Sequence, residues 1–325
     1  MADTTTRSID CNKPGYTTLD QLGEESTRFF QENGYLVLTG AVSEEERRAL
    51  IDEAAAICRG RRGELGGAVP KLEGADGMSD DEVLKHFLCI HQPHKVSETI
   101  HRFLSHKGNV EVLTRVIGPN VKCMQSMLFI KAAGKAGQAW HQDEDYIPTR
   151  DRSLCGAWIA IDDAVIENGC LWVIPGSHKR GVLYPQYPHN DKRFDCALEA
   201  YGFPYTEKDE VPVEVPAGSI VFFNGYLLHR SLPNRSEKGY RRVLVNHYMS
   251  AESLLPWRHK EGVSVAKNDF RDIVMVAGED PYAYKGCEDV TRPHVREAGD
   301  GGCGDGRSDL ETFLKTASPE RIARA

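Results

Sequence analysis

Residues 121–176 read VKCMQSMLFIKAAGKAGQAWHQDEDYIPTRDRSLCGAWIAIDDAVIENGCLWVIPG, and this stretch decides the fold class. It holds four short apolar or alternating runs, at Val121–Lys131, Ala139–Tyr146, Leu154–Ile161 and Cys170–Ile174. Glycines, prolines and an Asn-Gly pair separate these runs. Short strands divided by turns are typical of a β-sandwich or barrel and not of a parallel α/β sheet. We therefore predict a mainly β fold.

The flanking sequence extends this pattern in both directions. Further strands are predicted at Val211–Val215, Ser219–Asn224 and Arg242–Tyr248. Before residue 121, capping-box patterns at Thr18/Gln21 and Ser43/Glu46 and apolar periodicity over residues 80–116 predict helices. We expect a flexible tail over 1–17, one domain over 18–295 with a lid-like insertion at 177–210, and a polar, flexible tail over 296–325.

Composition narrows the class of protein. Forty basic and forty-eight acidic residues give the 325-residue chain a formal charge of −8, which argues against a nucleic-acid-binding surface. The apolar runs are too short to span a bilayer, and the first thirteen residues lack the apolar core of a signal peptide. Nine cysteines are scattered without a C-x-x-C pair. We expect a cytoplasmic enzyme with reduced thiols that binds neither membrane nor nucleic acid and acts on a small molecule.

A possible metal site begins at His141 and Asp143. On a strand these two side chains would point to one face, and a His-x-Asp pair is by itself a weak signal. His229 follows a predicted strand and turn, so it could supply the second imidazole of a two-His, one-carboxylate triad. Arg241 begins another strand, and its planar, permanently charged fork suits a carboxylate. A metal with open positions beside such an arginine is what a 2-oxo acid cosubstrate requires.

The ordered combination of these motifs resembles the phytanoyl-CoA dioxygenase family. The likeness is carried by His141-Gln142-Asp143, Gly156–Ile161, Glu167–Trp172, Pro175–His178, His229-Arg230-Ser231, Asn234 and Gly239-Tyr240-Arg241. It spans most of residues 18–250. The resemblance implies a double-stranded β-helix, also called a jelly-roll or cupin-like fold, and an Fe(II)- and 2-oxoglutarate-dependent dioxygenase.

The resemblance also assigns roles to individual residues. By it, His141, Asp143 and His229 bind Fe(II), and Arg241, assisted by the hydroxyl of Ser231, holds the distal carboxylate of 2-oxoglutarate. Trp158 and Met127 line the cosubstrate pocket, and Lys85 lies near the place where relatives offer a lysine to 2-oxoglutarate. Arg242 is the alternative to Arg241, which we prefer because Gly239-Tyr240-Arg241 keeps the family pattern.

The resemblance and the chemistry of the side chains also suggest interpretations for several nearby residues. Arg230 stands where relatives commonly have glycine, and with Arg150, Arg152, Lys179 and Arg180 it suggests an anionic substrate. We interpret His247 as a core residue in preference to a pocket residue. His91 and His94 are interpreted as surface histidines at a loop or helix end.

The predicted reaction is hydroxylation of a small organic substrate by dioxygen, with decarboxylation of 2-oxoglutarate to succinate and CO2. The intact Asp143 favours hydroxylation, since related halogenases have a small residue there. Oxidative demethylation, desaturation or cyclisation at the same iron is one alternative. A non-catalytic jelly-roll protein that binds a metal or ligand is another, and a zinc hydrolase is weaker because no general base stands out.

Overall fold

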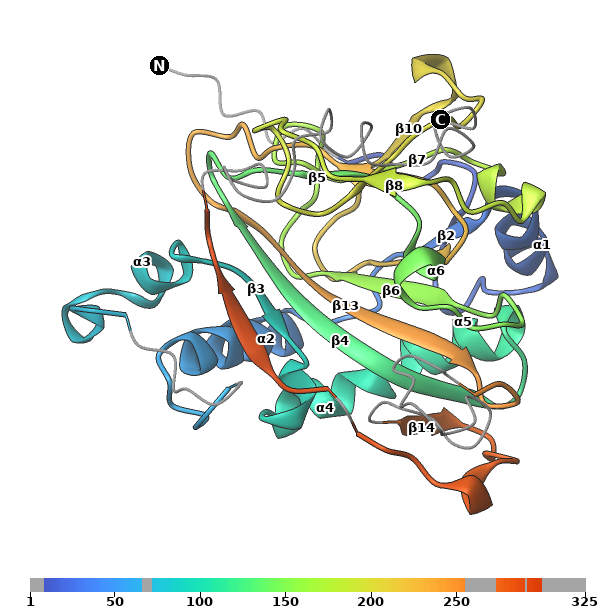
Figure 1. Cartoon of the computed structure of the whole chain (residues 1–325), viewed down its shortest axis with the longest axis horizontal. Helices are drawn as coiled ribbons and strands as arrows, with labels where there is room; N and C mark the ends of the chain where they lie inside the picture. The colour runs from blue at the N-terminus through green and yellow to red at the C-terminus, as the bar shows by residue number, and fades with distance from the viewer. Residues whose placement is uncertain (1–8, 66–71, 255–272, 290, 300–325) are drawn as a thin grey trace, which may run out of the picture.

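The computed structural model describes residues 9–65, 72–254, 273–289 and 291–299, which form two facing β-sheets with helices on one outer side (Figure 1). The predicted mainly β architecture with flanking helices is confirmed. It is the cupin-like double-stranded β-helix, and the sheets of the described residues do not close into a barrel. Within these residues, no helix is long and apolar enough to cross a membrane.

The larger sheet is built around the two longest strands, β4 (Val121–Ala132) and β13 (Tyr240–Ser250), which pair along their whole length. Among the described residues its strand order is β1 (Tyr16–Thr17), β2 (Tyr35–Leu38), β11 (Ile220–Asn224), β6 (Cys155–Ala160), β13, β4, β3 (Phe87–His91) and β15 (His294–Glu297), with β14 (Val274–Ala277) also on β4. In Figure 1, β15 is the orange-red strand beside β3.

The smaller sheet faces it and carries shorter strands. Its order is β10 (Val211–Val213), β7 (Leu171–Val173), β12 (His229–Ser231) and β5 (Gln138–His141). Side chains alternate along each strand of the larger sheet, so Val243 and Val245 of β13 pack toward the smaller sheet, while Leu244 packs toward the helices. The space between the two sheets therefore receives every second residue of β4 and β13.

Helices cover the outer face of the larger sheet. They are α1 (Glu24–Asn33), α2 (Glu44–Cys58), α3 (Asp80–Leu84), α4 (Glu98–Leu104) and α5 (Lys107–Val116). The capping box predicted at Ser43/Glu46 is present in the structure and starts α2. The box predicted at Thr18/Gln21 is wrong, because α1 begins at Glu24 after an uncapped Gly23.

Two other local predictions are corrected. The segment 80–116 is not continuously helical, because β3 and the short helix at Pro93–Lys95 interrupt it. The strand predicted over Ala139–Tyr146 ends at His141, and Asp143–Tyr146 forms the helix α6. Gln142 is still extended, with φ −130° and ψ 126°, so His141 and Asp143 retain strand-like alternation across this boundary.

Strands of the larger sheet extend beyond the expected domain bounds of 18–295 at both ends. Tyr16 and Thr17, placed in the expected N-terminal tail, form β1 on β2, and β15 extends to Glu297 past the expected domain end. The insertion 177–210 contains the two-stranded pair β8 (Gln186–Tyr187) and β9 (Glu199–Ala200). Residues 1–8 and 300–325 of the two expected tails lie outside the described residues.

Candidate active site

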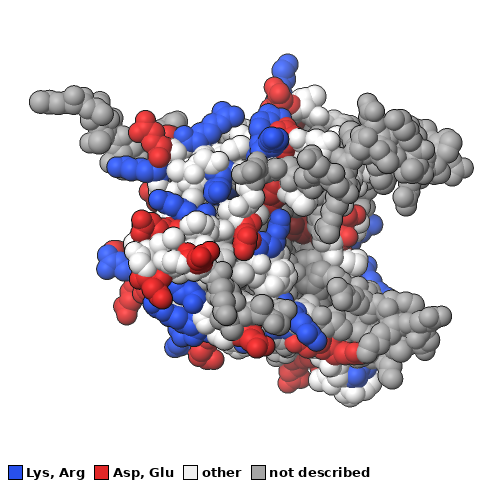
Figure 2. Space-filling view, turned by 60° about the vertical axis from the view of Figure 1, so that its left-hand side comes forward, with Lys and Arg blue, Asp and Glu red and all other residues white. Residues whose placement is uncertain are grey.

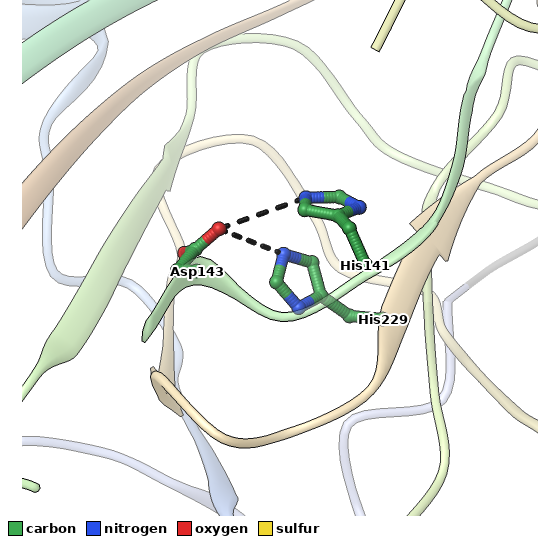
Figure 3. A group of neighbouring side chains, drawn as sticks. All are labelled: His141, Asp143 and His229. Atoms are coloured by element: carbon green, nitrogen blue, oxygen red, sulfur yellow. Dashed lines mark ion pairs between the residues drawn. The ribbon is translucent and has the colours of Figure 1, made fainter. Parts of the chain in front are cut away.

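Two histidines face each other on neighbouring strands of the smaller sheet. His141 on β5 and His229 on β12 are partners in the antiparallel register, and their ring centroids are 4.1 Å apart. Each Nδ1 lies close to a backbone carbonyl, His141 to Ala139 at 2.7 Å and His229 to Leu227 at 2.9 Å. With Nδ1–H donating to these carbonyls, the lone pair of each ring is on Nε2. Both Nε2 atoms point to the same place (Figure 3).

Asp143 completes the cluster from the start of α6. Its Oδ1 lies 3.6 Å from Nε2 of His141 and 3.6 Å from Nε2 of His229. One ligand atom from each of the three residues lies within 4.8 Å of the others, and all three residues are buried. Two imidazoles and a carboxylate on one side of a point suit iron(II), because this donor set leaves further coordination positions open.

Gln142 fixes the short connection between the two ligand candidates. Its fully buried side chain donates to the carbonyls of Val182 and Tyr226 at 2.9 and 2.7 Å and accepts from the N–H of Tyr184 at 2.8 Å. Both polar atoms of the amide are thus used, which holds the backbone between His141 and Asp143 in place.

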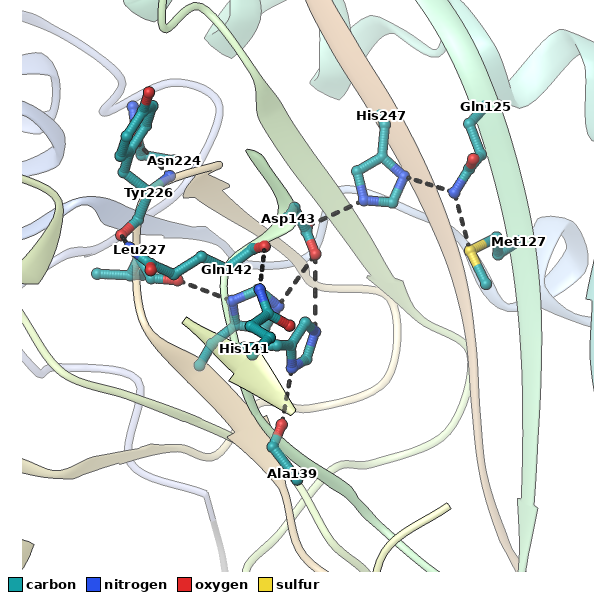
Figure 4. A network of polar contacts seen from close by, with 12 residues as sticks. Gln125, Met127, Ala139, His141, Gln142, Asp143, Asn224, Tyr226, Leu227 and His247 are labelled. Carbon is teal, nitrogen blue, oxygen red and sulfur yellow. Dashed lines mark hydrogen bonds and ion pairs between the residues drawn. The ribbon is translucent and has the colours of Figure 1, made fainter. Parts of the chain in front are cut away.

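His247 supports Asp143 from the opposite sheet (Figure 4). Its Nε2 lies 3.0 Å from Oδ2 of Asp143, the oxygen that the other two imidazoles leave free, and its Nδ1 lies 3.5 Å from Nε2 of Gln125. An ionised carboxylate only accepts hydrogen bonds, so His247 donates from Nε2. The interpretation of His247 as a core residue is wrong, because residue 247 lies on the inner face of β13 and lines the cavity.

Electrostatics keep the cluster ready for a cation. Burial raises the pKa of Asp143, but the imidazoles of His229 and His247 outweigh burial and hold that pKa below its ordinary value. Burial, followed by the neighbouring His229, lowers the pKa of His141 to about 4. Asp143 is therefore ionised and His141 neutral at neutral pH, which are the forms that bind metals.

A cavity of about 750 Å³ opens between the sheets beside this cluster. Seven of the eight predicted site residues line it, namely Met127, His141, Asp143, Trp158, His229, Ser231 and Arg241. The structure does not bring Lys85 to it. Lys85 follows α3, outside the inner face of the sheet, and lines a separate cavity with His86 and Lys135.

The inner end of the cavity carries two buried cations side by side. Lys131 of β4 and Arg241 of β13 are partners in the strand register and are both 3 % exposed. The hydroxyl of Ser231 lies between them, 2.9 Å from Nζ of Lys131 and 3.4 Å from Nη2 of Arg241. Because that oxygen accepts from both cations, its own O–H remains available to donate. These three side chains therefore present hydrogen-bond donors to a ligand.

Each cation is also held by neutral groups. Nζ of Lys131 donates to the carbonyl of Leu232 at 2.7 Å, and Nε of Arg241 donates to the carbonyl of Gly169 at 3.1 Å. Gly169 has φ +82°, and a Cβ there would lie 2.2 Å from the carbonyl oxygen of Leu232. The Arg241 guanidinium lies 5.4 Å from the Trp158 ring, which gives that aromatic a cation–π contact.

No carboxylate in the described part of the chain pairs with Lys131 or Arg241. Burial, and then Arg241, lowers the pKa of Lys131 well below its ordinary value, and burial lowers the pKa of Arg241 to about 10. Two buried like charges oppose each other directly, an arrangement that costs free energy unless an anion joins them.

The neighbouring arginines behave differently. Arg242 points to the other face of β13 and forms a bidentate pair with Asp162, at 2.8 and 2.7 Å. Of the five cations that suggested an anionic substrate, Arg230 lines the cavity, but it pairs with Glu210 at 2.6 Å. Its guanidinium also lies 4.7 Å from the Trp140 ring.

Lys131 and His247 were missed, although strand alternation carried the signal for both. Lys131 lies four residues from Met127 in a predicted strand, and His247 lies six residues from Arg241 in another, so each shares a face with an assigned site residue. A lysine on the apolar face of a strand is itself unusual, because lysine is almost never fully buried without a partner.

The sequence matches the family described as Phytanoyl-CoA dioxygenase (PhyH) over residues 30–243. The chain belongs to the phytanoyl-CoA dioxygenase family. It is 34% identical over 261 residues to phytanoyl-CoA dioxygenase 1 of Oryza sativa subsp. japonica, covering 71% of this chain and 90% of the rice protein. It is 28% identical over 297 residues to the peroxisomal phytanoyl-CoA dioxygenase of Rattus norvegicus, covering 86% and 83%.

Solved structures share the fold of this phytanoyl-CoA dioxygenase family member. The 2-oxoglutarate-dependent carbocyclase SnoK from nogalamycin biosynthesis has a TM-score of 0.58 at 22% identity, covering 80% of this chain and 99% of SnoK. EvdO2 from Micromonospora carbonacea, solved with 2-oxoglutarate, has a TM-score of 0.52 at 22% identity, covering 70% and 91%. The epimerase SnoN, solved with Fe3+, 2-oxoglutarate and nogalamycin RO, has a TM-score of 0.52 at 18% identity, covering 74% and 88%.

Family membership and the three-residue cluster together confirm the resemblance and the predicted cofactor set of iron, 2-oxoglutarate and dioxygen. This family member is therefore an enzyme of the Fe(II)- and 2-oxoglutarate-dependent oxygenase class. The structural relatives include a cyclase and an epimerase, so the class alone does not fix what happens to the substrate.

Proposed function

We propose that the protein hydroxylates a small organic substrate, using one oxygen atom of O2 and converting 2-oxoglutarate to succinate and CO2 with the other. The observation that carries this proposal is the position of two complementary sites in one cavity. A cluster suited to iron lies beside it on the smaller sheet, and a pair of cations without a carboxylate partner among the described residues lies on the larger sheet.

His141, Asp143 and His229 would hold the metal, with the two Nε2 atoms and Oδ1 as ligand atoms. Iron(II) bound there supplies the activation of O2 at the expense of 2-oxoglutarate. The backbone carbonyls of Ala139 and Leu227 orient the imidazoles.

Arg241, Lys131 and Ser231 would bind the distal carboxylate of 2-oxoglutarate. Three donors converge there, and a carboxylate would neutralise the repulsion between the two cations. We assign to Lys131 the contact that the sequence suggested for Lys85. The Trp158 ring contacts the guanidinium of Arg241, and Met127 lines the cavity from β4, the strand next to that of Arg241.

Hydroxylation is proposed over the other outcomes because the carboxylate ligand is present. Asp143 is buried and held by His247, so its Oδ1 would occupy the position that a halogenase leaves open for chloride. The cyclase and epimerase among the structural relatives make loss or exchange of a substrate hydrogen without oxygen insertion the alternative outcome.

The test begins without oxygen. Apoprotein loaded anaerobically with one equivalent of Fe(II) should develop a weak visible charge-transfer band on addition of 2-oxoglutarate, and exposure to O2 should then yield succinate. Asp143→Ala should abolish both signals. Arg241→Ala should weaken 2-oxoglutarate binding, while Arg242→Ala serves as the control on the other face of the same strand.

The outcome for the substrate is read from 18O2. Hydroxylation places one labelled oxygen in the product and one in succinate, whereas cyclisation, desaturation or epimerisation leaves the organic product unlabelled. Iron-loaded protein that forms neither the band nor succinate would instead favour a non-catalytic metal- or ligand-binding protein.

A further inference from the structure

A row of basic side chains lies along the C-terminal strand of the larger sheet. Arg292, His294 and Arg296 occur at alternate positions along or just before β15, and all three line the cavity. Alternation places them on one face of this edge strand. We call them the β15 row. Arg292 and His294 are exposed, and Arg296 is half-buried.

The β15 row continues onto β3 through a histidine pair. His294 is the register partner of His91, and the two rings are stacked with centroids 4.3 Å apart and planes at 7°. Burial, and then the neighbouring His294 and Arg296, lower the pKa of His91 to about 3, so His91 is neutral at neutral pH. Its buried Nε2 has no hydrogen-bond partner among the described residues. The expectation of surface histidines is wrong, because His91 lines the cavity and His94 is buried.

The arginines of the β15 row differ from the paired arginines elsewhere in the protein. Arg230 and Arg242 each have a carboxylate partner at 2.6–2.8 Å. In the described part of the chain, neither Arg292 nor Arg296 has one. An anionic group at this wall would accept hydrogen bonds from both guanidinium groups, and from Nε2 of His91 in the tautomer that carries the proton on Nε2.

The charge of the cavity contrasts with that of the whole chain. Five lysine and arginine side chains line it, Lys131, Arg230, Arg241, Arg292 and Arg296, against the two carboxylates of Asp143 and Asp195. Of these five, Arg230 is paired with Glu210. Asp195 accepts from the backbone N–H of Ala197 at 3.0 Å and pairs with no described cation. The whole chain carries −8, and on the surface drawn in Figure 2 basic and acidic side chains are interspersed. The cavity therefore concentrates positive charge that the surface does not.

Strand register places the β15 row at a distance from the metal cluster. Val245 on β13, Met127 on β4, His91 on β3 and His294 on β15 are successive partners across four strands. Adjacent strands are about 4.8 Å apart, so the four span about 14 Å. His247, the next inward residue after Val245, contacts Asp143. Met127, Phe129 and Val245 supply apolar surface along this path.

We propose that the β15 row, with His91, binds a carboxylate or phosphate group of the primary substrate, whose apolar part extends across Met127 and Phe129 toward the metal. This rests on the proposed oxygenase function and adds a substrate class to it: an organic anion with its charged group on the order of 14 Å from the carbon that reacts.

The subsite is distinct from the cosubstrate site. β15 lies two strands from β4, which is about 10 Å across the sheet. Along the strands, Arg296 is aligned through Cys89 with Phe129, about 7 Å from Lys131, and His294 is aligned through His91 with Met127, about 13 Å from Lys131. An organic anion and 2-oxoglutarate would therefore occupy different parts of the same cavity, and both could be bound together.

The experiment is anaerobic calorimetry on the full chain, loaded with Fe(II) and saturated with 2-oxoglutarate so that the Lys131 and Arg241 site is occupied. The probes are decanoate, decyl phosphate and decanol, which share one chain length and differ in the head group. At least one anion should bind about tenfold tighter than decanol, and the tighter one identifies the head group. Heat of binding requires no turnover, so the result is independent of whether the protein proves to be an oxygenase.

Variants locate the interaction. Arg292→Gln and Arg296→Gln should each weaken binding of the preferred anion several-fold and leave decanol unchanged, and the double variant should lose the preference. Arg28→Gln, an exposed arginine on α1 that does not line the cavity, is the matched control. Unchanged circular dichroism and unchanged 2-oxoglutarate affinity would show that the variants are folded.

Three results would overturn the proposal. Decanol could bind as tightly as the anions, the double variant could keep the preference, or the anions could bind only when 2-oxoglutarate is absent. The last result would mean that the probes occupy the cosubstrate site. The Fe(II)-loaded protein could also fail to bind 2-oxoglutarate while Arg292→Gln and Arg296→Gln still weaken anion binding. In that case the proposed function fails and the anion subsite stands.

Discussion

At the scale of single residues, one polar atom of each side chain in the site is hydrogen-bonded within the protein and another remains free for a ligand. Nδ1 of His141 and of His229 donates to a backbone carbonyl, and Nε2 remains free. Oδ2 of Asp143 accepts from His247, and Oδ1 remains free. Ser231 accepts from two cations and keeps its proton to donate. Such committed partners orient the remaining atoms before any ligand arrives.

His247 should act as a positioning residue for Asp143. His247→Leu removes the donor to Oδ2, so we expect Fe(II) affinity to fall about 10- to 100-fold, the usual effect of losing a group that orients a ligand. His247→Gln, which keeps an N–H donor near the same place, should recover much of the loss. Anaerobic metal titration measures both variants. Equal affinity in the Leu variant and the natural protein would contradict the role.

Substitutions of Lys131 and Lys85 should affect the affinity for 2-oxoglutarate differently. Lys131→Met removes a charged donor from the buried end of the cavity, so 2-oxoglutarate should bind on the order of 10- to 100-fold more weakly, as expected for a hydrogen bond to a charged group. Lys85→Met should leave the affinity unchanged, because Lys85 lines a different cavity. Calorimetry on both variants decides between the two lysines.

The lowered pKa of Lys131 also predicts how the affinity for 2-oxoglutarate changes with pH. Burial lowers the pKa of Lys131 in the free protein, and a bound carboxylate would favour the protonated form and raise that pKa again. Binding of 2-oxoglutarate should therefore take up a fraction of a proton and weaken as the pH rises through the lowered pKa. Calorimetry in buffers of different ionisation enthalpy measures the uptake, which should disappear in Lys131→Met. Proton release on binding would contradict this assignment.

At the scale of elements, alternation in long strands was predictable and short elements were not. The predicted strands at Val121–Lys131 and Arg242–Tyr248 match β4 and β13, and their inner faces carry Lys131, Arg241 and His247. The three residues of β12 show no period of their own, and they are extended because β5 and β7 pair on both sides. Pairing supplied by the rest of the fold leaves no local signal.

The position of Lys85 outside the cavity with the metal cluster has the same origin. Because β3 was read as part of a helical segment, the path of the chain after residue 84 was wrong. The strand begins at Phe87, so Lys85 lies at the corner between α3 and β3, before the chain joins the sheet. The β15 row was missed for a similar reason, since a four-residue edge strand in a polar segment gives no apolar alternation.

Two capping-box patterns show how tertiary structure selects among local signals. Ser43 accepts from the N–H of Glu46 and starts α2, whereas Thr17, next to Thr18, is held in β1 against β2. We expect Ser43→Ala to lower the free energy of unfolding by about 1 kcal/mol. Thr18→Ala, which removes a hydroxyl and a methyl group at an unused box, should alter it by less than about 0.5 kcal/mol. Urea unfolding of both proteins measures the difference, and equal losses would contradict the structural assignment.

At the scale of the whole molecule, the proposed ligands would connect the two sheets. The smaller sheet contributes His141 and His229, and the larger sheet contributes Lys131 and Arg241. A 2-oxoglutarate molecule that meets the metal at one end and the cations at the other would bridge them. Metal and cosubstrate should therefore stabilise the fold together more than the sum of their separate effects.

Thermal unfolding under anaerobic conditions tests this coupling. A ligand at 100 times its Kd adds about 2.7 kcal/mol to the free energy of unfolding, which for a chain of this size raises Tm by a few degrees. With Fe(II) present, 2-oxoglutarate should raise Tm by more than it does alone, because only then are both its ends held. Asp143→Ala should remove the dependence on metal and keep a small shift from 2-oxoglutarate alone. Arg241→Ala should keep the shift from Fe(II) and lose most of the additional shift. Additive shifts in the natural protein would mean that the two ligands do not meet in the cavity, and the bridging arrangement would have to be abandoned.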